Sequence, residues 1–280
     1  NEGLSRRLYG NWLPVPETSV TQGQVTYAQR TFVAPFDDAP PQGVPWWFSR
    51  RPLCVAQYAV RNTGEGPAPV SLLLTAFADT AQGEAADILA VDGGAVIRDG
   101  DRLLAFVDTS AAPGLTATIE GGRLTLAGEL GGRGYAKVSA RIPGWELPAG
   151  EYAALRTDAD LLARTQMYWE RLLSEATQVE VPDPLLSDII RASQVHCLIA
   201  ARSEQDGAQI APWIGSDRYG PLESEANSII LGMDYLGHTD FSRRCLEHFV
   251  GRYNPAGYLT TGYTLMGTGW HLWTLAEHFA

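Results

Sequence analysis

Lysine, cysteine and long apolar runs are all scarce in this chain. Of its 21 basic residues only Lys137 is a lysine, and 32 acidic residues give a formal net charge of −11. A chain this acidic lacks the basic surface that attracts nucleic acid or anionic lipid. The longest apolar run, residues 70–78, is shorter than the roughly 18 residues that span a bilayer. We therefore expect neither nucleic acid nor a membrane among its partners.

The three cysteines, Cys54, Cys197 and Cys245, are far apart and odd in number. They show no C-x-x-C spacing, so neither a disulfide framework nor a thiolate metal site is indicated. All five histidines lie from residue 196 onward, and no two of them form an H-E-x-x-H pair. The sequence therefore indicates no metal and no other cofactor.

The first half of the chain has the two-residue period of β-strands. Short strands alternate with turn clusters such as Glu120-Gly121-Gly122, at intervals of about ten residues. This spacing predicts an antiparallel β-sandwich domain over residues 1–155. The predicted strands are residues 24–33, 53–60, 70–77, 103–107, 115–119, 124–127 and 136–142.

From about residue 157 the apolar period changes to 3.6, which predicts helices. Asp183 and Pro184 are typical of an N-cap and a first helical residue, and Gly237 and Gly251 are typical of helix ends. Because strands come first and helices follow, we predict a separate helical domain over residues 156–280. Its helices are expected over 160–175, 184–201, 221–237 and 239–251, and from about 268. In the second of these we expect Leu185, Leu186 and Ile189 to be buried.

The connector between the second and third helices is unusually aromatic and charged. Trp213 and Tyr219 can stack on the apolar face of a sugar ring. Asp217 and Arg218 can make charge-assisted hydrogen bonds to vicinal hydroxyl groups. Asp217 and Glu223 are the two candidate catalytic carboxylates. The structural alternative is that Asp217 and Arg218 cap a helix or form a pair, while Glu223 stabilises the N-terminus of the next helix.

A second polar and aromatic loop, residues 252–271, ends in Trp270 and His271, which we also expect to bind substrate. Its three tyrosines and many Thr and Gly residues are typical of the wall of a cleft. The alternative is a surface loop whose last aromatic residues start a helix in the core. Trp46 and Trp47 lie in a proline-rich loop of the strand half, as either an inter-domain plug or a platform for a sugar.

The order of these parts resembles the six-hairpin glycosidase superfamily of glucoamylase-like enzymes. The likeness rests on the helix end Tyr168-Trp169-Glu170-Arg171-Leu172-Leu173, the helix start Val181-Pro182-Asp183-Pro184, residues 223–237, and Gly269–Leu275. The resemblance implies an N-terminal β-sandwich of supersandwich type followed by the helical hairpins of an (α/α)6 toroid. The family presents an Arg-Asp pair before the helix of residues 223–237, whereas this chain has the order Asp217-Arg218.

The resemblance also implies a carbohydrate-active enzyme that hydrolyses glycosidic bonds of an oligo- or polysaccharide with inversion. In that chemistry one carboxyl group protonates the glycosidic oxygen, and a second, about 6.5–9.5 Å away, activates water. A glycoside phosphorylase of the same architecture and a non-catalytic carbohydrate-binding module are the alternatives. About 125 residues are left for helices, whereas a ring of twelve needs at least about 200. We therefore expect an incomplete barrel that the remainder of a longer chain completes.

Overall fold

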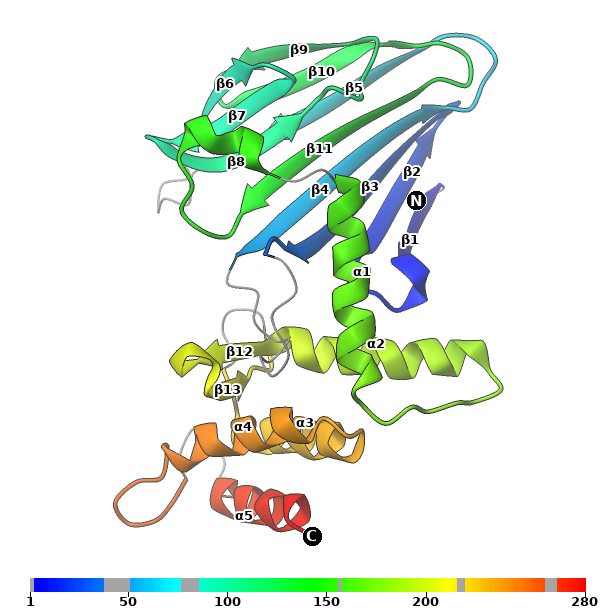
Figure 1. Ribbon diagram of the computed structural model, residues 1–280. Coiled ribbons are helices and arrows are strands. Elements are labelled where there is room, and N and C mark those ends of the chain that lie inside the picture. Colours follow the sequence, from blue (N-terminus) through cyan, green and yellow to red (C-terminus); the bar gives the residue numbers. More distant parts are fainter. Residues whose placement is uncertain (1–2, 38–50, 77–85, 156–157, 216–219, 260–265) are drawn as a thin grey trace. The chain divides into compact units, whose positions relative to one another are not determined.

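The computed structural model describes residues 3–37, 51–76, 86–155, 158–215, 220–259 and 266–280. The chain divides into two compact units (Figure 1). Unit 1 holds the described residues up to Met167 except Asn11–Pro14, and unit 2 holds Asn11–Pro14 together with the described residues from Tyr168. The division falls within helix α1 (Asp158–Ser174). The domain boundary expected at residue 155 stays a prediction.

Unit 1 contains two antiparallel sheets that enclose one apolar core. The larger sheet has eight strands in the order β1-β2-β3-β4-β11-β8-β7-β6, and the smaller has three in the order β5-β10-β9. Val60 and Val138 of the larger sheet and Leu124 and Leu126 of the smaller are almost fully buried in this core. The predicted arrangement of antiparallel strands before helices is therefore confirmed. The strands are β1 Leu4–Leu8, β2 Pro16–Gln22, β3 Val25–Pro35, β4 Pro52–Asn62, β5 Ala68–Thr75, β6 Asp87–Val91, β7 Gly94–Asp99, β8 Arg102–Asp108, β9 Leu115–Glu120, β10 Arg123–Leu130 and β11 Tyr135–Pro143.

Four strands that the sequence pattern did not predict, β1, β2, β6 and β7, lie toward the two edges of the larger sheet. No residue of β1 or β2 is buried, while β7 buries three consecutive residues, Ala95, Val96 and Ile97. A two-residue apolar period appears only where one face of a strand is buried and the other is exposed. β1, β2 and β7 do not meet that condition, and β6 buries Ile88 alone, so none of the four sequences carries such a period.

The tight turn between β9 and β10 shows how the glycine clusters set the strand ends. Gly121 and Gly122 occupy the two central positions and have φ values of 52° and 74°. A two-residue hairpin turn of this hand needs positive φ at both positions, which glycine adopts without strain. The cluster Glu120-Gly121-Gly122 therefore ends one strand and starts the next, as predicted.

Unit 2 is helical apart from one hairpin. Besides the second half of α1 it contains α2 (Pro184–Ala200), α3 (Glu223–Tyr235), α4 (Thr239–Val250) and α5 (Gly267–His278), with a hairpin of β12 (Ala201–Glu204) and β13 (Gln209–Pro212) between α2 and α3. Asp183 caps α2 as predicted, since its carboxylate accepts a hydrogen bond from the Leu185 N–H at 2.8 Å. In the described part of the chain no helix is long and apolar enough to cross a membrane.

The burial predicted for α2 is wrong in its first two turns. Leu185, Leu186 and Ile189 are 65%, 50% and 49% exposed. The residues that α2 buries are Gln194, Val195 and Leu198, in its C-terminal half. Helix α2 contacts α3 and the β12–β13 hairpin, and nearer its start Asp188 and Arg191 contact Asn11 and Trp12. The apolar period correctly predicted a helix, but it does not show whether another element packs on the apolar face.

Candidate functional site

Helices α3 and α5 of unit 2 pack side by side and run in the same direction (Figure 1). At their first residues, Gly267 lies so close to Glu223 that a Cβ atom on Gly267 would be 2.7 Å from Glu223 Cγ. At their last turns, Asp234 Oδ2 lies 3.0 Å from His278 Nδ1. The intervening helix α4 packs on both. Two parallel helices joined through a third are what successive helical hairpins produce.

This parallel packing brings two sequence-predicted loops to one end of unit 2. The connector that holds Trp213 leads into Glu223 at the start of α3, and the loop after α4 leads into Gly267 at the start of α5. Leu259 of the second loop lies at the same place, because its carbonyl oxygen would be 3.1 Å from a Cβ on Gly267. Residues about 40 positions apart in the chain are therefore neighbours here.

Glu223 lies at the centre of this end and is only 1% exposed. It is in the first turn of α3, and its Oε1 would lie 3.1 Å from a Cβ on Gly267, the first residue of α5. A carboxylate is favoured at the positive N-terminal end of a helix, and here two such ends are close. This position agrees with the structural alternative for Glu223, in which the carboxylate stabilises helix starts.

The loop after α4 has an ordered structure of its own around Asn254. The Asn254 side-chain oxygen accepts hydrogen bonds from the N–H groups of Ala256 and Tyr258, both at 3.0 Å. The Leu259 N–H then donates to Thr268 Oγ1 at 2.9 Å, which ties the loop to the first turn of α5. Tyr258 is left 61% exposed on this loop. An aromatic ring on an anchored loop is a suitable surface for stacking.

His271 is fully buried, so in this structure its ring packs inside unit 2. Its Nδ1 lies 2.8 Å from the hydroxyl of Tyr253, and its ring packs near Phe249. Burial lowers the pKa of His271, and the Leu246 carbonyl opposes that shift. A neutral imidazole in this place can hold the Tyr253 hydroxyl in position. The sequence placed both residues in the second loop but did not predict their pairing.

Trp213 follows directly after β13, and a cation stacks on its ring. The Arg202 guanidinium of β12 lies 3.5 Å from the centre of the Trp213 ring, a cation–π contact. The hairpin is itself anchored on α4, because Arg244 donates a hydrogen bond to the Gly207 carbonyl at 2.8 Å. One face of Trp213 is thus occupied by Arg202, and a ligand would meet the other face or the edge. Arg202 was not predicted, because only the hairpin places it against the tryptophan.

Trp270 is half-buried on α5, with its ring centre 5.5 Å from that of Trp273. Trp273 is 45% exposed and donates a hydrogen bond from its indole N–H to Glu277 at 3.1 Å. Of the other predicted site residues, Asp217, Arg218 and Tyr219 lie outside the described residues, as do Trp46 and Trp47. The structure therefore brings Glu223 close to the helix that carries Trp270 and His271, and it leaves the Asp217 group untested.

One cavity among the described residues of unit 2 lies elsewhere and is small. It has a volume of about 50 Å³ and is lined by residues that include Trp169, Leu198 and Phe241. A cavity of this size holds one or two waters at most. None of the predicted site residues lines it. Within the described ranges, no group of three or more His, Cys, Asp or Glu side chains could hold a metal ion.

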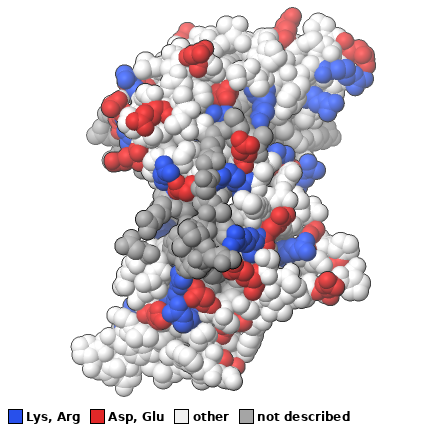
Figure 2. All heavy atoms as spheres, in the orientation of Figure 1, with Lys and Arg blue, Asp and Glu red and all other residues white. Residues whose placement is uncertain are grey.

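The charged side chains on the face seen in Figure 2 do not form a basic surface of the kind that binds nucleic acid. There the acidic and basic side chains are interspersed and do not gather into one basic area. Several of the basic residues are paired, such as Arg243 with Asp240 and Glu247 on α4. This pattern agrees with the net charge of −11.

Comparison with known proteins gives little. No family model matches the chain, and no curated protein matches it. Among solved structures, a "Putative kojibiose phosphorylase from human microbiome" is similar, with a TM-score of 0.37 and 9% sequence identity over 66% of this chain. The chain spans only 26% of the length of that protein. A likeness of this degree assigns neither a family nor an activity to the chain.

Proposed function

We propose that this chain is part of a carbohydrate-active enzyme that breaks glycosidic bonds, with its substrate at the common N-terminal end of α3 and α5. The observation that carries this proposal is the packing of Gly267 on Glu223, which places two loops rich in aromatic and polar residues side by side. Helical hairpins that follow an antiparallel β-sandwich are also what the resemblance to six-hairpin glycosidases implies. In this proposal further hairpins complete an (α/α)6 toroid.

The sugar is bound in this proposal by stacking and by hydrogen bonds to its hydroxyl groups. Trp213, Tyr219 and Trp270 supply aromatic faces, which fit the apolar face of a pyranose ring. Asp217 and Arg218 supply charged donors and acceptors for vicinal hydroxyl groups. His271 acts through another residue, since it is buried and holds the hydroxyl of Tyr253.

The reaction we propose is hydrolysis with inversion, which needs two carboxyl groups about 6.5–9.5 Å apart. Of the two candidates, we assign Asp217 as one of these carboxyl groups, and in this proposal the second comes from a hairpin that completes the toroid. Glu223 is 1% exposed and packs on Gly267, which suits a positioning role at the helix starts. A phosphorylase would need one carboxyl group together with inorganic phosphate as the attacking group, so phosphate dependence separates the two reactions.

Product analysis on the whole protein tests this proposal. The protein is incubated with α- and β-linked disaccharides, with and without inorganic phosphate, and the released sugars are identified. We expect free monosaccharide without phosphate, and at least about a hundredfold loss of kcat in Asp217→Asn, as for removal of a general acid or base. Asp92→Asn, in the exposed turn between β6 and β7, is the matched control. Release of sugar phosphate only when phosphate is present would replace hydrolysis by phosphorolysis, and absence of any product would remove the proposal.

A further inference from the structure

The outer face of the larger sheet in unit 1 is divided into an apolar half and a polar half. Along β3 the side chains on this face are polar or small at first and become apolar and buried toward its end. They are Thr26, Ala28, Arg30, Phe32 and Ala34. The residues of β4 that pair with them change in the same way. The apolar half is buried where the first half of α1 meets the end of β3. There Arg164 Nε donates to the Pro35 carbonyl at 3.0 Å. The polar half is left open and forms a hollow.

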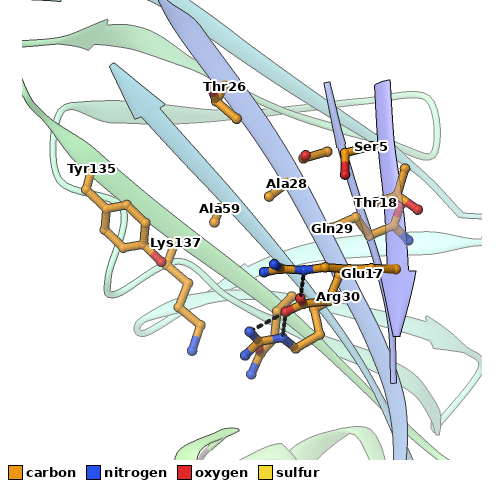
Figure 3. A pocket seen from close by; sticks show the side chains of 13 residues that line it. Ser5, Glu17, Thr18, Thr26, Ala28, Gln29, Arg30, Ala59, Tyr135 and Lys137 are labelled. Atoms are coloured by element: carbon orange, nitrogen blue, oxygen red, sulfur yellow. Dashed lines mark hydrogen bonds and ion pairs between the residues drawn. The ribbon is translucent and has the colours of Figure 1, made fainter. Parts of the chain in front are cut away.

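This hollow has a volume of about 450 Å³ and reaches across five strands of the sheet. Ala28 and Ala59, which are partners in the register, form its floor. Tyr135 and Lys137 of β11 lie on one side, and Glu17 and Arg30 lie on the other (Figure 3). From β11 to β2 the width is about 14 Å, which is three strand spacings. Volumes of about 300–1,000 Å³ are typical of small-molecule sites.

One wall of the hollow is a fixed group of charges. Glu17 accepts hydrogen bonds from Arg7 Nε at 2.7 Å and from Arg30 Nε at 2.8 Å. Burial would raise the pKa of Glu17, but these two guanidinium groups hold it below its usual value. The carboxylate thus stays ionised and orients both arginines. Each guanidinium has five N–H donors, of which Glu17 takes only one or two, so further donors remain for a ligand.

The charge of the lining is opposite to that of the whole chain. Arg7, Arg30 and Lys137 carry three positive charges against one on Glu17, which leaves an excess of +2 in a chain of net charge −11. Lys137 is the single lysine of the sequence. A hollow with a local positive excess attracts an anionic ligand.

The remaining lining residues suit a ligand with many hydroxyl groups and an apolar face. Tyr135 exposes 53% of its surface beside the alanine floor, which together offer an apolar area for a ring. Around them lie hydroxyl and amide side chains that can donate and accept hydrogen bonds. On the face of the hollow these are Ser5, Ser19, Thr26 and Gln57.

We propose that this hollow binds an acidic saccharide of one or two rings, with its anionic group toward Arg30 and Lys137 and a ring face on Tyr135. The site lies in unit 1. The inference goes beyond the proposed function and does not depend on it, because the residues that line the hollow are all in unit 1.

Calorimetric titration of the whole chain with digalacturonate, lactose and inorganic phosphate tests the proposal. We expect digalacturonate to bind at least tenfold more tightly than either of the others. Glucuronate and glucose 6-phosphate then show whether the preferred anion is a carboxylate or a phosphate, and tighter binding of either than of glucose supports the proposal. Equal affinity for lactose, equal affinity for inorganic phosphate, or no binding of digalacturonate would each overturn it.

Variants locate the binding. Lys137→Met is expected to weaken digalacturonate binding at least fivefold, whereas Arg123→Met, an equal loss of charge at an exposed strand start, leaves it unchanged. Ala59→Leu fills the floor and is expected to abolish binding, with Ala117→Leu on exposed β9 as its control. Tyr135→Ala, at an exposed position, gives a second variant if Ala59→Leu does not fold. Unchanged affinity in both Lys137→Met and Tyr135→Ala would place the ligand elsewhere and overturn the proposal.

Discussion

The contact between Gly267 and Glu223 supports the whole arrangement of the candidate site, so a methyl group at Gly267 is a sharp probe. In Gly267→Ala the new Cβ would lie 2.7 Å from Glu223 Cγ and 3.1 Å from the Leu259 carbonyl oxygen. An ordinary carbon–carbon contact is about 3.5–4.0 Å, so the overlap is close to 1 Å. Overpacking of this kind costs about 1–3 kcal/mol. We expect that loss in the free energy of unfolding.

The assay is urea unfolding of the whole chain followed by tryptophan fluorescence. The matched control is Gly232→Ala at an exposed position in the last turn of α3, where the added Cβ meets nothing within 4 Å. That change should stabilise by about 0.5–1 kcal/mol, because alanine favours a helix over glycine. A Glu223→Ala background removes the clashing side chain, so part of the cost of Gly267→Ala should disappear, with a coupling of at least about 0.5 kcal/mol. A neutral Gly267→Ala, or strict additivity with Glu223→Ala, would refute the packing that joins the two loops.

Three further variants test the surroundings of the two units by the same unfolding assay. Asn62→Ala should cost about 2–4 kcal/mol, because the fully buried amide donates to the carbonyls of Gly66, Leu130 and Gly131. Burial lowers the pKa of His238 to about 4. Between pH 6.5 and 4 the unfolded chain therefore binds a proton on His238 that the folded chain does not. The free energy of unfolding is unaffected by this above pH 6.5 and falls by about 3 kcal/mol as the pH falls from 6.5 toward 4. His238→Gln should flatten that dependence. Tyr253→Phe should cost about 1–2 kcal/mol, because it removes the hydroxyl at 2.8 Å from His271 Nδ1.

Each of these variants has its own control. Asn62→Ala is compared with Asn254→Ala, whose bonds lie in an exposed loop, and an equal cost in the two would contradict the role of burial. For His238→Gln the wild-type chain is the control, and an unchanged loss of stability between pH 6.5 and 4 would contradict the role of His238. For Tyr253→Phe the control is Tyr258→Phe, and an equal loss there would mean that the hydroxyl of Tyr253 stabilises nothing.

Much of the fold could be predicted where one face of an element is buried. In β3 and β10 buried residues recur at every second position, as at Phe32 and Ala34, and β4 and β11 keep this period outside one run of consecutive buried residues. Glycine gives equally local information, as at Gly237, which ends α3 with φ of 86°. The edge strands and the β12–β13 hairpin have no such local pattern, because pairing with a neighbour is what defines them.

The candidate site could be predicted as residue types but not as an arrangement. The aromatic and charged composition of the two loops is visible in the sequence, whereas their common location follows from the parallel packing of α3 on α5. That packing depends on a missing side chain, at Gly267, opposite a buried carboxylate, at Glu223. Trp270 is half-buried whereas its neighbour His271 is fully buried, and the sequence predicted both as substrate-binding residues. At the start of α2 the sequence predicted burial that the structure does not show, because an apolar stripe identifies one face of a helix but not whether another element packs on it.

The most direct test of the central claim is hydrogen–deuterium exchange of the whole protein with and without a disaccharide that it cleaves or binds. The account predicts slower exchange in both loops together, at residues 213–215 and 220–222 of the first and 252–259 of the second, because Glu223 and Leu259 both lie beside Gly267 at the common end of α3 and α5. Exchange at the opposite helix ends, near Tyr235 and Glu277, should not change. Protection of one loop alone, or of the Tyr235 end, would contradict a shared substrate site.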